Sequence, residues 1–268
     1  MMTMVRGRAG ERHAYAGRHV LVCGASGNLG THLAGQLALL GARLTLWGRN
    51  ADALDSVATA CRGVSDAAVA TQCVDIADVA TALAALRQAD DAEPFDSVFL
   101  VSGAGDTREP GRRFDSPELI VKLGLVNYVA PAALAAEIGE RMAARGTGRI
   151  VLVGTAAASH PLPFAAGYTS SKCGLALFAE SLRLALKASG VSVTLASPGF
   201  FAAASAGTHA YARPGEISAD RVAEQIISAA ARAKPEVVTP RWFVFLRWLG
   251  RALPRPLRDR LLLSLPVP

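Results

Sequence analysis

Residues 19–30 read His-Val-Leu-Val-Cys-Gly-Ala-Ser-Gly-Asn-Leu-Gly, a short apolar run that passes directly into a turn with three glycines. The amphipathic stretch 31–40 follows, so the pattern predicts a strand, a tight turn and a helix. In that setting, glycines let the backbone approach a phosphate at the positive N-terminus of the helix. We therefore expect a nucleotide-binding loop rather than a plain structural turn, with contacts from Gly24, Ser26, Gly27, Asn28, Leu29 and Gly30.

The next apolar run, residues 43–47, ends in Gly48-Arg49-Asn50. At this place NAD-binding proteins carry an acidic residue for the ribose hydroxyls, whereas an arginine accommodates the 2′-phosphate of NADP. The acid is absent, and Arg49 can pair with a phosphate, so the sequence favours NADP(H) over NAD(H). The alternative is a solvated arginine in a loop.

Apolar runs and amphipathic stretches alternate along the rest of the chain. Further strands are expected at 68–74, 97–101, 149–153 and 191–196, and helices at 51–61 and 76–88. Such a series predicts an α/β fold with a doubly wound parallel sheet, which binds ligands at the carboxyl ends of its strands. Asp75, followed by Ile76, ends one of these strands and either faces an adenine or caps the next helix.

Residues 117–145 are long enough for one helix or two, and they carry Asn127 inside an apolar run. Because asparagine lowers helix propensity slightly, Asn127 either points at solvent or satisfies a buried polar network. The earlier turn Ser102-Gly-Ala-Gly105 permits close approach by a ligand.

Length and composition indicate the domain organisation. A chain of 268 residues with 51% hydrophobic content can bury a large core without disulfides or metals. We expect a flexible tail at 1–16, one domain at 17–240 and a basic amphipathic extension at 241–268. The N-terminal residues lack the apolar region of a signal peptide or a membrane span.

The formal charge of +6 is concentrated at the ends of the chain. Residues 1–18 contribute +3 and residues 241–268 contribute +5, which leaves −2 for the middle. A nearly neutral body argues against nucleic-acid binding. The four cysteines show no close pair and no metal-ligand spacing, so we expect no metal site and reduced thiols in a cytoplasmic protein; they are Cys23, Cys61, Cys73 and Cys173.

Tyr168 and Lys172 lie four residues apart in the segment Gly167-Tyr-Thr-Ser-Ser-Lys-Cys173. On a helix this spacing places both side chains on one face. A neighbouring ammonium favours the phenolate and lowers the pKa of a phenol from about 10 towards useful acid/base work. The pair predicts a proton-transfer site, although it also arises by chance in unrelated chains.

Together these motifs resemble the short-chain dehydrogenase/reductase family over roughly residues 17–240. The matching positions are Gly24-Ala-Ser-Gly-Asn-Leu-Gly30, Asp75, Ser102-Gly-Ala-Gly105, Asn127, Thr155, Tyr168, Lys172 and Pro198-Gly199. The resemblance implies a single Rossmann-like domain with a seven-stranded parallel sheet flanked by helices. It also implies a nicotinamide cofactor and assembly into a homodimer or homotetramer.

The resemblance assigns roles to the matching residues. Tyr168 would protonate a carbonyl oxygen, and Lys172 would tune that phenol and hold the nicotinamide ribose. Thr155 would polarise the carbonyl in place of the family's serine, and Asn127 would hold a water that links Lys172 to solvent. The expected cofactor contacts outside the first loop are Arg49, Asp75, Ile76, Gly103, Ala104, Gly105, Pro198 and Gly199, together with Tyr168 and Lys172.

The departures from the family pattern fall at positions that bind the cofactor in family members. Gly27 stands one position earlier than the corresponding glycine of the single-domain branch, and Cys23 replaces a threonine. Ser102 and Gly103 replace two asparagines that stabilise the central sheet in family members. The threonine that normally follows Pro198-Gly199 is missing from residues 200–204.

Residues 200–216 occupy the part that covers the substrate in this family. Phe200, Phe201 and Tyr211 either indicate an apolar or aromatic substrate or simply pack the lid. Further candidates for the pocket wall are His160, Pro161 and Phe164.

The extension 241–268 places Arg247, Arg251 and Arg255 four residues apart among large apolar side chains. Its amphipathic run is too short to span a bilayer. Three interpretations stay open: a helix packed on the body or on a second subunit, a flap beside an apolar substrate, and peripheral attachment to an anionic membrane.

The leading hypothesis is an NADPH-dependent ketoreductase that reduces the carbonyl of a lipophilic or polycyclic small molecule, with Tyr168 as the acid. One alternative is a nucleotide-binding protein with little redox activity. The other is a dehydratase or epimerase that uses its bound nucleotide without net redox change.

Overall fold

A single parallel sheet organises the chain, with its strands in the order β3-β2-β1-β4-β5-β6-β7. The computed structural model describes residues 10–66, 68–105, 111–201 and 215–264. The strands are β1 (His19–Cys23), β2 (Arg43–Gly48), β3 (Val69–Cys73), β4 (Ser97–Leu100), β5 (Gly148–Val153), β6 (Val191–Pro198) and β7 (Glu236–Thr239).

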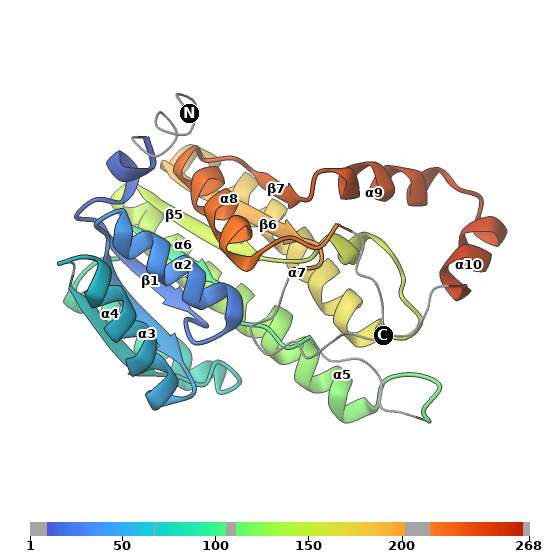
Figure 1. The fold of residues 1–268 in the computed structure, drawn as a ribbon, viewed down its shortest axis with the longest axis horizontal. Coiled ribbons are helices and arrows are strands. Elements are labelled where there is room, and N and C mark those ends of the chain that lie inside the picture. Colours follow the sequence, from blue (N-terminus) through green and yellow to red (C-terminus); the bar gives the residue numbers. More distant parts are fainter. Residues whose placement is uncertain (1–9, 67, 106–110, 202–214, 265–268) are drawn as a thin grey trace.

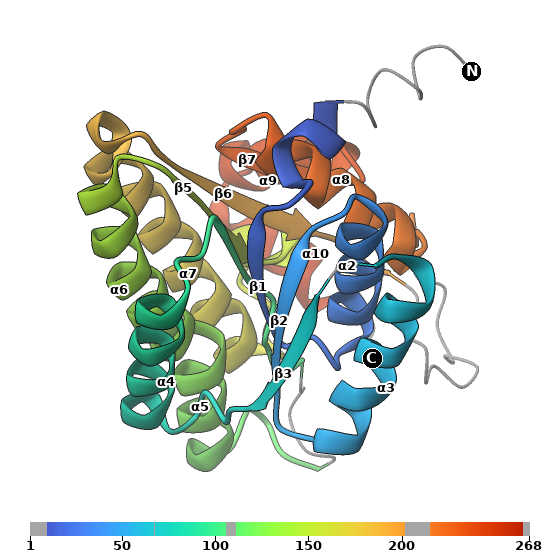
Figure 2. The same ribbon diagram turned by 90° about the vertical axis from the view of Figure 1, so that its left-hand side faces the viewer.

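Helices cover both faces of the sheet (Figure 2). One face carries α2 (Asn28–Leu39), α3 (Ala51–Val64) and α8 (Ala219–Ala231), and the other carries α4 (Val79–Ala92), α6 (Ala130–Arg145) and α7 (Ala166–Ala185). The doubly wound, seven-stranded Rossmann-like sheet expected from the sequence is confirmed. The remaining elements are α5 (Pro117–Gly124), η1 (Leu125–Val129), η2 (Ala156–Ser159), η3 (Lys187–Ser189), α9 (Trp242–Ala252) and α10 (Arg255–Leu263).

Strand β1 shows why its sequence is apolar from Val20 to Cys23. Val20 and Val22 belong to the core beneath α2, α3 and α8, whereas Leu21 and Cys23 belong to the core on the opposite face. Successive side chains point to opposite faces of a strand, and both faces are covered, so these four positions are apolar. The buried His19 at the start of the strand has hydrogen-bond partners for both ring nitrogens. The chain then moves outward through β2 and β3 before it returns to β4 on the other side of β1. This reversal is the switch point at which such sheets bind ligands.

The helical run at 117–145 is continuous, but it contains a π-helical turn at η1. That turn carries Asn127, which is fully buried, so the alternative of a buried polar network holds. Among the described helices, this run alone has the length and hydropathy of a membrane span. Its residues Leu134, Ile138 and Met142 are fully buried in the core of the sheet.

The flexible tail expected at 1–16 requires a correction for its second half. Residues 10–15 are helical, and Tyr15 is fully buried, with its hydroxyl donating to the Ile227 carbonyl at 3.2 Å. The composition of the segment is mostly polar and basic, so the sequence did not predict that Tyr15 would be buried and would contact α8. Residues 1–9 lie outside the described ranges.

Candidate active site

The loop after β1 closes on itself and on the end of β4. Gly24 has a φ of +92°, and a Cβ there would lie 2.8 Å from the Ser102 amide nitrogen. A Cβ on Gly30 would overlap the Gly24 carbonyl oxygen and lie 2.9 Å from the Ala25 Cα. Both positions therefore need glycine, the first for its left-handed conformation and the second for its close contact with the loop.

Helix α2 presents its N-terminus at this loop. Gly27 is its N-cap, and within the described ranges no side chain caps the helix and no acidic residue lies in its first turn. Backbone amides at Asn28, Leu29 and Gly30 thus begin the helix at the positive end of its dipole. The Leu29 side chain is buried in the core, so only its backbone faces the loop. This arrangement fits the phosphates of a dinucleotide.

Arg49 and Ser26 border the end of β2. A Cβ on Gly48 would lie 2.8 Å from the Ser26 Oγ, so the serine hydroxyl lies beside this strand end. The next residue, Arg49, is exposed, and no carboxylate of the described ranges forms an ion pair with it. An exposed guanidinium at this edge suits a phosphate partner.

The capping alternative for Asp75 is wrong. Helix α4 begins at Val79, and its N-cap is Asp78, whose carboxylate accepts hydrogen bonds from the Thr81 amide at 3.1 Å and the Thr81 hydroxyl at 2.7 Å. Asp75 is exposed and accepts a hydrogen bond from the Ala77 amide at 3.0 Å. Ile76 is buried, so its backbone alone remains for a ligand.

Asn127 holds the turn after β4 in place. Its Oδ1 accepts from the Ala104 amide at 2.8 Å, and its Nδ2 donates to the Ala104 carbonyl at 2.9 Å and to the Ser171 Oγ at 3.3 Å. A Cβ on Gly103 would lie 3.1 Å from both the Asn127 Oδ1 and the Lys172 Nζ. The turn residues Gly103 and Ala104 therefore meet Asn127 and Lys172 at one place, and Gly105 follows them as an exposed residue.

Lys172 is almost completely buried within this cluster. Its Nζ donates a 2.8 Å hydrogen bond to the carbonyl oxygen of Val153, the last residue of β5. Burial disfavours the charged ammonium and lowers the pKa of Lys172 from 10.5 to about 8. The Lys172 amine is therefore still mostly protonated at neutral pH, but its pKa lies only slightly above that pH.

Tyr168 lies one helical turn before Lys172 and pairs with Thr155. Burial raises the pKa of the Tyr168 phenol, and the hydrogen bond with the Thr155 side chain lowers it in part. The expected lowering of the phenol pKa by Lys172 is therefore wrong for this structure: burial raises the pKa, and the hydrogen bond that lowers it in part comes from Thr155 and not from Lys172. A phenol with a raised pKa stays protonated at neutral pH and can act as a proton donor.

Thr155 also connects the pair to the end of β6. Its hydroxyl donates to the Pro198 carbonyl at 3.4 Å and accepts from the Ala157 amide at 3.3 Å. The amide of Gly199 donates to the Thr239 carbonyl at 2.7 Å. A Cβ on Gly199 would overlap the ring of Phe243, so α9 closes over this strand end.

Ser102, Cys23 and Asp115 support the site from behind, and of these three only Asp115 is not marked by a motif of the sequence. Ser102 replaces an amide of the family pattern, and its hydroxyl lies 3.2 Å from the Cys23 Sγ, which joins β1 to β4. Burial raises the pKa of the Cys23 thiol to about 11, so the sulfur stays protonated. Asp115 is buried and accepts from the Gly167 amide at 2.7 Å, which fixes the first turn of α7 just before Tyr168. Only the long-range fold brings Asp115 there, and no sequence motif marks it.

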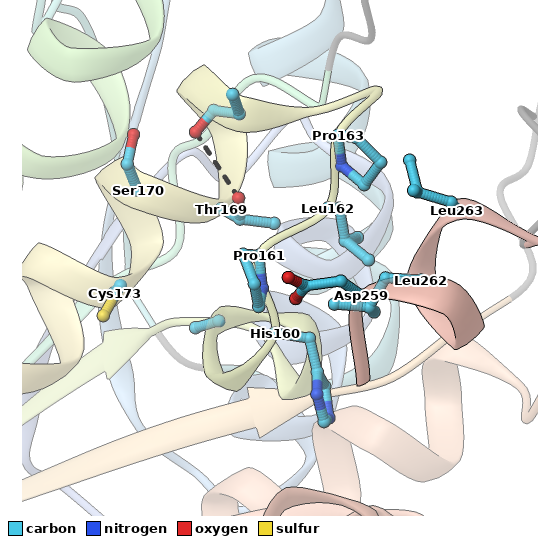
Figure 3. Close-up of a pocket in the computed structure, with 12 residues that line it drawn as sticks. His160, Pro161, Leu162, Pro163, Thr169, Ser170, Cys173, Asp259, Leu262 and Leu263 are labelled. Carbon is cyan, nitrogen blue, oxygen red and sulfur yellow. Dashed lines mark hydrogen bonds between the residues drawn. The ribbon is translucent and has the colours of Figure 1, made fainter. Parts of the chain in front are cut away.

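A cavity of about 730 Å³ lies between α10, the segment 158–163 and the first turns of α7 (Figure 3). His160 and Pro161 line it as expected, whereas Phe164 does not, and neither do Tyr168 or Thr155. The hydroxyls of Thr169 and Ser170 in its wall bond to their own helix backbone at 3.0 Å and 3.2 Å. The wall is therefore mainly apolar. Tyr211 lies outside the described residues.

The buried Lys172 gives the folding stability a specific pH dependence. Below pH 8 the folded protein keeps a buried ammonium, which lowers its free energy of unfolding. Between pH 8 and pH 10.5 the folded state has lost this proton while the unfolded chain keeps it, so stability rises with pH. We expect wild type to gain up to about 3 kcal/mol relative to Lys172→Met over this interval. Urea unfolding of both proteins at pH 7 and pH 10 measures the difference, and an unchanged difference would contradict the burial of a titrating amine.

Comparison with known proteins agrees with this geometry. The family model for short chain dehydrogenases matches residues 18–212. An uncharacterized oxidoreductase of Myxococcus xanthus is 31% identical and covers 90% of this chain and 95% of its own. Dehydrogenase/reductase SDR family member 7B of Bos taurus is 28% identical, over 94% of this chain and 82% of its own.

Solved structures share the same fold. A short-chain dehydrogenase from Sphingobium yanoikuyae, determined in complex with NADPH, superposes with a TM-score of 0.75 at 24% identity, over 93% of this chain and 96% of its own. A bulky-bulky ketone specific alcohol dehydrogenase from Comamonas testosteroni gives a TM-score of 0.75 at 21% identity, over 93% and 95%. The sequence match and the shared fold lead to one conclusion: the chain belongs to the short-chain dehydrogenase/reductase family of oxidoreductases, whose members bind a nicotinamide cofactor.

Proposed function

We propose that the protein is an NADPH-dependent reductase that converts a carbonyl group of a lipophilic small molecule to an alcohol. The observation that carries the proposal is the pairing of Tyr168 with Thr155 at the end of β5, with Lys172 buried one turn away. These groups lie at the carboxyl ends of the strands, at the same edge as the glycine loop after β1.

The residues divide the chemistry between them. The nicotinamide, when bound, supplies the hydride. Tyr168 donates its proton to the carbonyl oxygen. The Thr155 hydroxyl, which donates a long 3.4 Å hydrogen bond to the Pro198 carbonyl, turns its hydrogen to that same oxygen when the substrate binds. Lys172 and Asn127 form the buried polar cluster behind Tyr168, from which the phenol can be reprotonated.

The preference for NADPH rests on the end of β2. Gly48 leaves no carboxylate to repel a 2′-phosphate, and Arg49 is exposed beside it. The loop and the α2 N-terminus fit the shared pyrophosphate of both nucleotides, so they do not distinguish between them. Arg49 is therefore the residue that distinguishes NADPH from NADH.

The lipophilic character of the substrate rests on the surroundings of the site. Phe200 and Phe201 follow the strand end at which Thr155 bonds Pro198. The adjoining cavity has a volume typical of ligand pockets and a mainly apolar wall. An apolar molecule gains most from such surroundings because it leaves no polar group unsatisfied.

Initial-rate assays with NADPH and with NADH over a panel of aliphatic, aromatic and polycyclic ketones test the proposal. We expect turnover with NADPH, a preference for apolar ketones, and a loss of about tenfold or more in the NADPH preference for Arg49→Ala. Arg62→Ala, on α3 away from the loop, is the matched arginine control. Tight NADPH binding without oxidation by any ketone would instead favour a binding protein with little redox activity.

A further inference from the structure

Helices α9 and α10 carry large apolar side chains that no part of the described chain covers. Phe245 and Trp248 are 61% and 65% exposed, and Val244 lies beside them on the same side of α9. Leu257 and Leu261, one turn apart on α10, are both more than half exposed. We use the name apolar face for these five residues together, three on α9 and two on α10. Figure 1 shows both helices at one end of the molecule, beyond β7.

The opposite side of α9 is fixed to the body. The Phe243 ring packs against Gly199, and a Cβ on Gly250 would lie 2.7 Å from the His160 ring. Arg247 makes two hydrogen bonds to the Glu236 carboxylate, at 2.7 Å and 3.0 Å. Because these contacts orient the helix, Phe245 and Trp248 point outward as a consequence of the fold. The expectation of a helix packed on the body therefore accounts for only one side of α9.

The charges around the apolar face are positive. Asp259 is the only acidic residue from 241 onward, and Arg258 pairs with it at 3.4 Å. Arg241, Arg255 and Arg260 are exposed, and none of them has an ion pair with a carboxylate within the described part of the chain. Exposed aromatic side chains flanked by arginine are the combination that binds the boundary between lipid headgroups and acyl chains.

A second copy of the chain fits this surface less well. A symmetric dimer contact would bring the same patch of both subunits together, so the three arginines would face each other without a carboxylate between them. A membrane span is excluded by length, because α9 has 11 residues and about 20 are needed. The cavity-facing residues of α10, Leu262 and Leu263, are distinct from the apolar face.

We propose that the apolar face of α9 and α10, with Arg241, Arg255 and Arg260, binds the anionic surface of a lipid bilayer. The two helices lie in the plane of the membrane, with Phe245 and Trp248 inserted below the headgroups and the arginines paired with lipid phosphates. The proposal stands independently of the enzymatic activity, because its test measures binding to lipid alone.

Co-sedimentation of the full chain with vesicles tests the proposal. We expect binding to phosphatidylcholine vesicles that contain phosphatidylglycerol, and at least about tenfold weaker binding to phosphatidylcholine alone. Phe245→Ser with Trp248→Ser, and separately Arg255→Glu with Arg260→Glu, should each weaken binding to the anionic vesicles about tenfold or more. Leu39→Ser with Val64→Ser is the matched control, because both residues are exposed apolar side chains on the distant helices α2 and α3.

Sedimentation of the same proteins without lipid resolves the remaining outcomes. If wild type fails to bind anionic vesicles, or binds both kinds of vesicle equally, the proposal is wrong. If Phe245→Ser with Trp248→Ser converts an oligomer to a monomer and leaves vesicle binding unchanged, the apolar face is a subunit contact and the proposal is also wrong. Circular dichroism confirms that each variant is folded before its result is used.

Discussion

Tyr168→Phe is expected to lower kcat/KM for NADPH-dependent ketone reduction by about 100- to 10,000-fold, the range for loss of a general acid. The variant keeps the ring that packs at the start of α7 and removes only the hydroxyl that bonds Thr155. NADPH binding, measured by the fluorescence of the nucleotide, should change little. Initial rates with the best ketone of the panel give the effect.

Tyr128→Phe is the matched control for this experiment. Tyr128 is 37% exposed on η1, with its ring beside Gly174, and no hydroxyl of the described residues bonds its phenol. Removal of the Tyr128 hydroxyl should leave kcat/KM within about twofold of the wild-type value. Full activity of Tyr168→Phe would place the proton donor elsewhere and remove the basis for the proposed mechanism.

Gly30→Ala is expected to abolish measurable NADPH binding and to lower the free energy of unfolding by about 1–3 kcal/mol, the usual cost of overpacking. The added methyl group would overlap the Gly24 carbonyl oxygen, so the loop must move away from α2. A displaced loop no longer presents the amides at the helix N-terminus to a phosphate. Nucleotide titration and urea unfolding measure the two effects.

Gly35→Ala in the same helix is the control for Gly30→Ala. It makes the same substitution at a position where the added methyl group overlaps no atom of the residues that the structure describes. Within the described part of the chain, a Cβ at Gly35 meets no atom within 4 Å apart from its own stretch of helix, so alanine there should stabilise the helix by about 0.5–1 kcal/mol and leave NADPH binding intact. If Gly30→Ala behaves like Gly35→Ala in both measurements, the loop after β1 does not hold the nucleotide in the manner proposed.

The sheet could be predicted from the sequence because parallel strands covered on both faces are apolar throughout. Residues 20–23 are such a run, and the glycines after them mark the turn that ends at α2. Both signals are local, so no knowledge of distant contacts was needed. Asn127 was recognised as unusual for the same reason, since a polar residue within an apolar helix requires a partner.

Long-range contacts explain what the sequence could not provide. Tyr15 is buried because α8 passes over it more than 200 residues later. The pKa of Tyr168 is raised because the surrounding chain excludes water from the phenol, and the spacing of four residues to Lys172 does not show how much chain surrounds it. Asp115 reaches the start of α7 only through the folded α5–α7 packing.

The π-helical turn at η1 also determines which side chains of the following helix, α6, face the sheet. One extra residue in a helix turns all later side chains by about 100° about the axis. Leu134, Ile138 and Met142 face the sheet only with this extra residue in place. A homologue that lost a single residue between Gly124 and Ala130 would thus rotate its whole α6 and would have to rebuild that half of its interior with a different set of side chains.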